Sequence, residues 1–104
     1  QIGFNEQGSY AKSPTRLVEL SHNSRKVQSG QFFGLDKTPK MAITMGIGTI
    51  MQAKKILVVA SGADKAEIVK KAFFGPITPQ VPASILQLHP DVTVVVDEAA
   101  GSLI

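Results

Sequence analysis

Two apolar runs with a helical pattern between them constrain the fold of this chain more than any other feature. Residues 55–60 (KILVVA) and 92–97 (VTVVVD) are almost continuously apolar and rich in β-branched side chains. This is typical of strands that are covered on both faces in a parallel sheet. Between them, residues 66–73 place apolar side chains at helical spacing up to Gly75, and residues 81–88 predict a short second helix. We therefore expect a βαβ unit with a right-handed crossover.

The remaining segments carry weaker patterns. Residues 15–20 alternate apolar and polar side chains, as in a strand with one wet face. Residues 21–24 then supply a polar turn, and residues 25–37 indicate irregular chain with one helical turn. At the other end of the chain, residues 98–104 are expected to open a final helix.

A further helix is expected over residues 39–53. Thr38 offers a side-chain oxygen as N-cap, and Pro39 suits the first helical position, where its missing N–H costs nothing. Apolar side chains recur in the segment at helical spacing, namely Met41, Ala42, Met45, Ile50 and Met51. Gly46 and Gly48 are interpreted as points of close packing, because a dinucleotide fingerprint would need a preceding strand and a third glycine.

Composition bounds the class of protein. At 104 residues, with 43% hydrophobic and 18% charged residues, the chain suits one globular domain but is short for an α/β enzyme with its own substrate cleft. The net charge of +3 is dispersed, which does not favour nucleic acid as a partner. No stretch approaches the roughly 18 apolar residues of a membrane span. The absence of Cys excludes disulfides and fits a reducing compartment, so we expect a soluble cytoplasmic protein.

One strand end offers a candidate ligand site. In open parallel sheets, ligands bind beyond the carboxyl ends of the strands, and residues 61–65 (SGADK) follow the first apolar run. A small turn that leads into a helix presents backbone N–H groups and the positive end of the helix dipole, and Lys65 adds a cation. This combination suits a phosphate. On pattern alone, a tight turn with a solvated lysine is the favoured alternative.

The other chemistry-bearing residues give weaker hypotheses. Asp97 and Glu98 follow the second run and are interpreted as carboxylates at a helix N-terminus rather than as an acid/base pair. His22 is expected to be exposed. His89 is interpreted as a hydrogen-bonded structural residue, with a general base as the alternative. Two isolated histidines and no Cys predict no metal site.

A series of short motifs resembles the glucosamine-6-phosphate deaminase family. The matching strings follow the family's order along the chain: 2–6 (IGFNE) with 8–9 (GS), 39–50, 53–57, 61–66 and 86–91 (LQLHPD). The resemblance implies an α/β fold, part of a doubly wound, mostly parallel, Rossmann-like sheet. It also implies conversion of glucosamine 6-phosphate to fructose 6-phosphate and ammonia through an enediol-type species, with no metal or organic cofactor.

The resemblance assigns roles to four positions. Glu6 matches the family's Glu that orients the ring-opening His, and Gln1 stands where that His is expected. An amide cannot cycle a proton near neutral pH. Lys65 matches the phosphate-binding Lys, and Gln31 falls at the position of the phosphate-binding Arg. Gln31 can still donate hydrogen bonds to a phosphate, but it lacks the bidentate charged contact.

Further comparison with the family concerns regulation and completeness. Ser9 and Arg16 match an allosteric site of some members, although Val18 stands where a Lys is expected. The family's phosphate loop and proton-transfer carboxylate lie in its N-terminal half. We therefore expect residues 1–104 to form one domain, the C-terminal portion of a longer one, to lack activity alone, and to have further sequence before Gln1.

Three alternatives to this function are kept open. Galactosamine 6-phosphate is a second candidate substrate of the same reaction. A 6-phosphogluconolactonase would share the fold and a phosphate-bearing sugar substrate. A sugar-phosphate-binding regulatory domain without catalysis is favoured by Gln1 and Gln31. In each case the partner is a small sugar phosphate. Because members of the family often form oligomers, we also expect a homo-oligomer.

Overall fold

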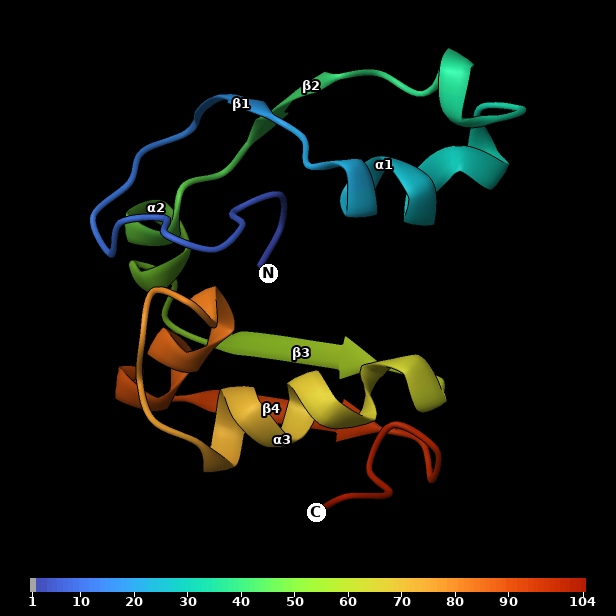
Figure 1. Cartoon of the computed structure of the whole chain (residues 1–104). Helices are drawn as coiled ribbons and strands as arrows, with labels where there is room; N and C mark the ends of the chain where they lie inside the picture. The colour runs from blue at the N-terminus through green and yellow to red at the C-terminus, as the bar shows by residue number, and fades with distance from the viewer. Residues whose placement is uncertain (1) are drawn as a thin grey trace.

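Two small sheets organise the structure, a computed structural model that describes residues 2–104. An antiparallel pair of strands belongs to the first half of the chain, and a parallel pair belongs to the second half. Figure 1 shows the antiparallel pair at the top and the parallel pair at the bottom, with the chain crossing between them on one side only. The other side is open.

The antiparallel pair joins β1 (Arg16–Glu19) to β2 (Met41–Thr44). The register places Arg16 opposite Thr44 and Glu19 opposite Met41. The strand predicted at residues 15–20 is therefore confirmed.

The prediction of one helix over residues 39–53 is wrong. Residues 41–44 form β2, and only α2 (Ile47–Met51) is helical. The pairing with β1 overrides the helical pattern, which is common where tertiary hydrogen bonds compete with local propensity. Thr38 is not the N-cap of an α-helix, and its hydroxyl instead donates to the Gly34 carbonyl at 2.8 Å.

Gly46 lies between β2 and α2 at a point of very close packing, as the sequence predicted. A β-carbon at this residue would lie 1.9 Å from the Ser13 carbonyl oxygen, so no side chain fits. The buried apolar residue of α2 is Ile47, whereas Met41 and Met45 of the predicted apolar stripe are about half exposed, at 48% and 54%.

The segment between β1 and β2 contains a helix that the sequence patterns did not predict. After Ser21, whose side chain caps the helix by accepting from the Ser24 N–H, α1 (His22–Gln28) begins directly. Two short 3₁₀ helices follow: η1 (Ser29–Gln31) and η2 (Leu35–Lys37). The supposed polar turn is thus the helix cap.

The parallel pair confirms the βαβ prediction. Strands β3 (Ile56–Ala60) and β4 (Val92–Val96) pair in register from Ile56 opposite Val92 to Ala60 opposite Val96. One expectation about these strands is wrong: only one face is covered. Leu57 and Val59 are 66% and 69% exposed, because in the described residues the helices pack on the other face.

The crossover between these strands contains η3 (Ala63–Lys65), α3 (Ala66–Phe74) and η4 (Pro82–Leu88). The predicted second helix is thus a 3₁₀ helix. Side chains of α3 and η4 form the main apolar core with the turn after β4: Ala66, Val69, Ala72, Leu86 and Ala100 are all buried. The final helix predicted at residues 98–104 is absent, since these residues form turns.

Candidate functional site

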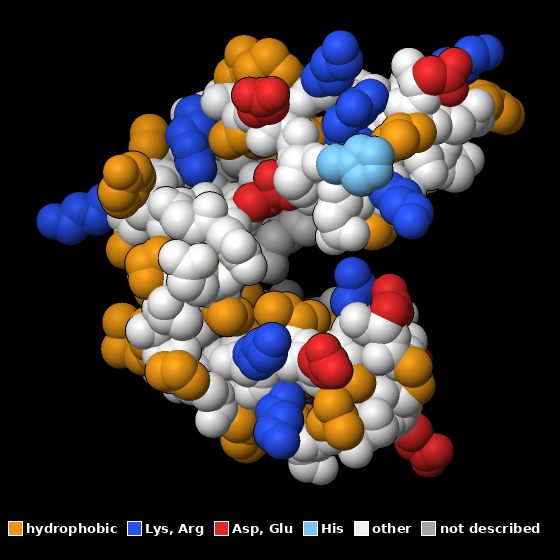
Figure 2. Space-filling model, viewed as in Figure 1, with side chains coloured by type: hydrophobic (Ala, Val, Ile, Leu, Met, Phe, Trp, Pro, Cys, Tyr) orange, Lys and Arg blue, Asp and Glu red, His pale blue; other side chains and the backbone are white. Residues whose placement is uncertain are grey.

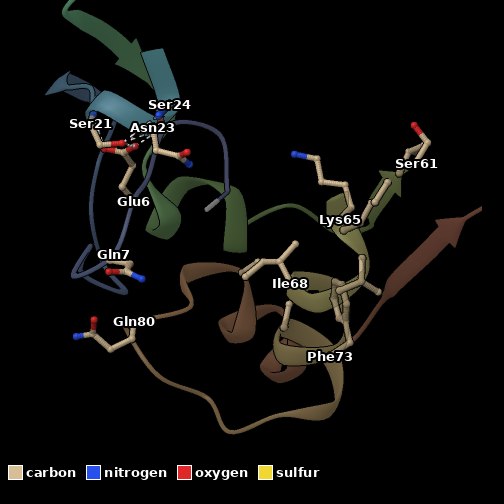
Figure 3. Close-up of a pocket in the computed structure, with 16 residues that line it drawn as sticks. Glu6, Gln7, Ser21, Asn23, Ser24, Ser61, Lys65, Ile68, Phe73 and Gln80 are labelled. Carbon is tan, nitrogen blue, oxygen red and sulfur yellow. Dashed lines mark hydrogen bonds between the residues drawn. The ribbon is translucent and has the colours of Figure 1, made fainter. Parts of the chain in front are cut away.

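A cleft of about 880 Å³ lies between the two halves of the chain. Figure 2 shows it as a deep notch in the surface, and Figure 3 shows the side chains that line it. Glu6 and Asn23 lie on the wall formed by the first half, and Ser61 and Lys65 lie on the wall formed by the second half. The cleft thus brings together residues from both ends of the sequence.

Glu6 is held by three hydrogen bonds from the start of α1. The Ser21 N–H donates to Oε2 at 3.0 Å, and the Ser21 hydroxyl donates to Oε1 at 2.7 Å. The hydroxyl of Ser24, which is buried, also donates to Oε1. Partial burial raises the pKa of the Glu6 carboxyl, but the bonds from Ser24 and Ser21 outweigh it, so the pKa lies below its ordinary value. The carboxylate is therefore an anion at neutral pH.

The loop that carries Glu6 is fixed by its neighbour Asn5, which is fully buried. The Asn5 amide group donates to the carbonyls of Ile2 and Met45 at 2.8 Å each. Its oxygen accepts from Arg16 Nη1 at 2.8 Å. The Asn5 side chain thus joins the loop to β1 and to Met45, just after β2. Its amide nitrogen and its oxygen both have hydrogen-bond partners.

Ser9 and Arg16, the two positions matched to an allosteric site, both make hydrogen bonds inside this region. Arg16 donates to Asn5 and, through the same nitrogen, to the Pro14 carbonyl at 3.1 Å. The Ser9 hydroxyl donates to the Glu6 carbonyl at 2.7 Å. Both residues therefore support the loop around Glu6.

Lys65 ends the turn that leads from β3 into α3. Figure 3 shows its side chain extending into the space between the two walls. The backbone N–H groups of the turn are only partly available: the Gly62 N–H donates to Asp97, and the Lys65 N–H donates to the Gly62 carbonyl at 3.1 Å. The Lys65 ammonium is therefore the main group that this turn offers to a phosphate.

Two glutamine positions were singled out from the sequence, and the structure describes only Gln31. Gln31 is exposed at the end of η1, and it does not line the cleft. Gln1 lies outside the described residues. The predicted roles of both positions therefore stay predictions.

The histidines agree with the structural interpretation. The buried His89 donates from Nε2 to the Ala53 carbonyl at 2.6 Å and accepts at Nδ1 from the Asp91 N–H at 3.0 Å. Both ring nitrogens are thus engaged, and the ring connects the end of α2 to the start of β4. His22 is exposed, as expected. Among residues 2–104, no group of three His, Asp or Glu side chains is placed to hold a metal ion.

Sequence reasoning missed several residues that shape the site. Asn5 and Ser24 gave no signal apart from their place in a motif, because short polar residues are common in turns. Asp97 was interpreted as a helix-terminal carboxylate, and it does accept from the Ala100 N–H at 2.8 Å. Its two further contacts to Gly62 depend on the pairing of β3 with β4, which only the fold reveals.

Comparisons with known proteins identify relatives of this chain. A family model described as glucosamine-6-phosphate isomerases/6-phosphogluconolactonase matches residues 15–95. A glucosamine-6-phosphate deaminase from Oenococcus oeni is 48% identical over 103 residues, which are 99% of this chain and 44% of that protein. One from Lachnoclostridium phytofermentans is 51% identical over 94 residues, which are 90% of this chain and 40% of that protein.

A solved structure, described as that of a monomeric glucosamine-6-phosphate deaminase, superposes with a TM-score of 0.94 at 46% identity. The match covers 97% of this chain and 42% of that one. This similarity confirms the α/β fold. The chain spans less than half the length of the relatives that it matches. No helix of the described residues combines the length and the apolar character that crossing a bilayer requires.

Proposed function

The chain belongs to the family of glucosamine-6-phosphate isomerases and 6-phosphogluconolactonases, and from this premise we propose that the protein carrying it converts glucosamine 6-phosphate to fructose 6-phosphate and ammonia. The observation that carries the proposal is the cleft, which places the anionic Glu6 and the cationic Lys65 on facing walls. Relatives named for this deamination are about half identical over nearly the whole chain, which supports the choice within the family.

In this proposal Lys65 anchors the phosphate of the sugar. An ammonium on a short turn at the start of a helix provides a charge-assisted hydrogen bond to a phosphate oxygen, and the helix dipole adds to the attraction. Gln31 stays a proposed second, uncharged donor to the same phosphate by resemblance alone, because it does not line the cleft.

Glu6 is proposed as the carboxylate beside the ring-opening step. Its three hydrogen bonds keep it ionised and in one orientation, so it can stabilise a positive charge that develops next to it. Gln1 occupies the position where the resemblance places the proton-cycling His. Ser9 and Arg16 are kept as a proposed effector site, although their internal hydrogen bonds favour a supporting role.

The test is ammonia release from glucosamine 6-phosphate by the protein in its gene-encoded length. Lys65→Ala should raise KM by about tenfold or more, because a charged hydrogen bond contributes roughly 1.5–3 kcal/mol. Lys71→Ala is the matched control, since Lys71 is an exposed lysine of α3 that does not line the cleft. Equal KM values for the two variants would exclude Lys65 as the phosphate anchor.

The same assay separates the alternatives. Release of ammonia from galactosamine 6-phosphate would identify the other epimer as substrate. Hydrolysis of 6-phosphogluconolactone without ammonia release would favour the lactonase. Binding of sugar phosphates with no turnover would favour a regulatory domain, which the glutamines at positions 1 and 31 support.

Two properties of the whole protein are proposed alongside its activity. These 104 residues contain no Cys, which fits a reducing compartment, and we propose that the whole protein is cytoplasmic. A homo-oligomer is the expectation from the family, whereas the similar solved structure is described as monomeric. Light scattering of the protein in its gene-encoded length decides between the two states.

A further inference from the structure

Asp97 connects the carboxyl ends of the two parallel strands. It follows β4 directly, and the register places Val96 of β4 opposite Ala60 of β3. The Gly62 N–H, just beyond β3, donates to both carboxylate oxygens of Asp97 at 3.2 Å each. The Ala100 N–H donates to Oδ1 at 2.8 Å. One carboxylate therefore holds the turn after β3 and the turn after β4 together.

The hydrogen bonds continue from Asp97 towards Lys65. Gly62 has a φ of 94°, a conformation that favours glycine, and a β-carbon there would lie 2.8 Å from Asp64 Oδ1. The carbonyl of Gly62 accepts from the Lys65 N–H at 3.1 Å. The peptide units on both sides of Gly62 are thus held, one by Asp97 and the other by Lys65. The backbone from which the Lys65 side chain extends is fixed through this turn.

We propose that Asp97 is a positioning residue for phosphate binding, which acts by fixing the turn at Gly62 and thereby the start of the Lys65 side chain. This inference rests on the proposed role of Lys65 as the phosphate anchor. A fixed turn lowers the entropy lost when the lysine engages its ligand, so the contribution of Asp97 is to binding.

The charge of Asp97 acts in the opposite direction. A carboxylate near an anion site repels the phosphate, so the two effects of this residue have opposite signs. An amide at the same place separates them. Asp97→Asn keeps an oxygen that accepts from the Gly62 and Ala100 N–H groups but removes the charge, whereas Asp97→Ala removes both.

The experiment measures KM and kcat for glucosamine 6-phosphate, and inhibition by inorganic phosphate, in the protein at its gene-encoded length. Asp97→Ala should raise both KM and the inhibition constant for phosphate by about fivefold, with kcat changed less than about twofold. Asp97→Asn should keep both constants at or below those of the wild type. Asp91→Ala is the matched control, because it removes an exposed carboxylate at the opposite end of β4.

Thermal unfolding of each variant separates positioning from folding. A merely structural role would lower the melting temperature and kcat of Asp97→Ala without a selective change in KM, and this result would overturn the inference. Unchanged phosphate inhibition in Asp97→Ala would overturn it as well. So would equal losses in the Asn and Ala variants, because the retained acceptor would then have no effect.

A second readout distinguishes this inference from the proposed reaction. Titration with inorganic phosphate should shift the amide NMR signals of Gly62 and Lys65, at about fivefold lower concentration in the wild type than in Asp97→Ala. If that difference is found without any ammonia release, the proposed deamination is wrong, and the positioning role of Asp97 stands. If phosphate leaves these signals unchanged in the wild type, the positioning role is wrong whatever the activity.

Discussion

The two halves of the chain are held together by different kinds of interaction. In the first half the buried residues are mostly polar: Asn5, Ser13, Ser24, Thr38 and Thr44, with Leu20 and Ile47 as the apolar exceptions. In the second half they are mostly apolar: Ala66, Val69, Ala72, Leu86 and Ala100, with Ser84 and His89 as the polar exceptions. Hydrogen bonds are directional but weak in net terms, whereas apolar burial is strong and non-directional.

This difference matches what each half contributes to the cleft. The Glu6 carboxylate is held in one orientation. Asn5 fixes the loop that carries it, and the hydroxyls of Ser21 and Ser24 donate to its oxygen. Lys65 needs a stable base, and it receives that from the apolar packing of α3. We therefore expect changes in the second half to affect stability most, and changes in the first half to affect stability less and the site more.

The largest effect is expected from Leu86→Ala in the apolar half. Leu86 is 2% exposed, so the change should lower the free energy of unfolding by about 2–5 kcal/mol through lost burial and a residual cavity. Urea denaturation measures it. Leu88→Ala is the control, because Leu88 is 65% exposed on the same 3₁₀ helix and should change stability by less than about 0.5 kcal/mol. Similar losses in both variants would show that the burial of Leu86 does not account for the loss.

A smaller loss of stability, with a loss of the site, is expected from Asn5→Ala. The change removes three hydrogen bonds and leaves the Arg16 guanidinium and the Met45 carbonyl without this partner, at a cost of about 2 kcal/mol. Urea denaturation should show this loss of stability. The activity that depends on Glu6 should fall more in Asn5→Ala than in Leu86→Ala. Asn23→Ala, at an exposed residue, serves as the stability control. If Asn5→Ala is as stable as the control, the three hydrogen bonds of Asn5 do not stabilise this half of the chain.

His89→Ala tests the connection between the halves. The ring joins the Ala53 carbonyl to the Asp91 N–H, so its removal should cost about 1–2 kcal/mol and increase hydrogen exchange at the Asp91 amide. The exposed His22 gives the control variant, His22→Ala, for which neither quantity should change. Unaltered exchange at Asp91 would mean that the imidazole does not hold this junction.

The smallest effect concerns the pH dependence of stability through Glu6. Because its pKa is lowered in the folded state, the unfolded chain binds more protons in the window below the ordinary pKa of about 4.3. The stabilisation that the ionised Glu6 contributes is thus complete above that value. It is lost as the pH falls through the lower pKa that Glu6 has in the folded state. Ser24→Ala removes one cause of the lowering, so its free energy of unfolding should fall less steeply between about pH 5 and pH 3.

The expected difference is below about 1 kcal/mol, since the carboxylate is only partly buried. Ser29→Ala is the control, because the Ser29 hydroxyl donates to the Lys26 carbonyl at the other end of α1 and contacts no carboxylate. Coincident pH profiles for wild type and Ser24→Ala would show that Ser24 does not tune Glu6.

The same contrast explains how far the sequence predicted the fold. The apolar half follows strong periodic patterns, so β3, β4, α3 and the turn at residues 61–65 were all predicted in place. In the polar half, the hydrogen bonds between β1 and β2 overrode a helical pattern. The helix α1 begins at residues that the pattern predicted to form a turn. The roles of Asn5 and Asp97 could not be predicted, because their partners are distant in sequence and are brought close by strand pairing.

The open face of β3–β4 has a consequence for handling this chain. In the described residues the ribbon has only two strands, so both of its edges carry unpaired backbone groups beside the exposed Leu57, Val59 and Val95. Exposed apolar side chains next to free strand edges are the usual template for aggregation. The solubility of the isolated polypeptide will therefore be limited by self-association, and a Lys at position 57 or 59 is the substitution that should improve its recovery.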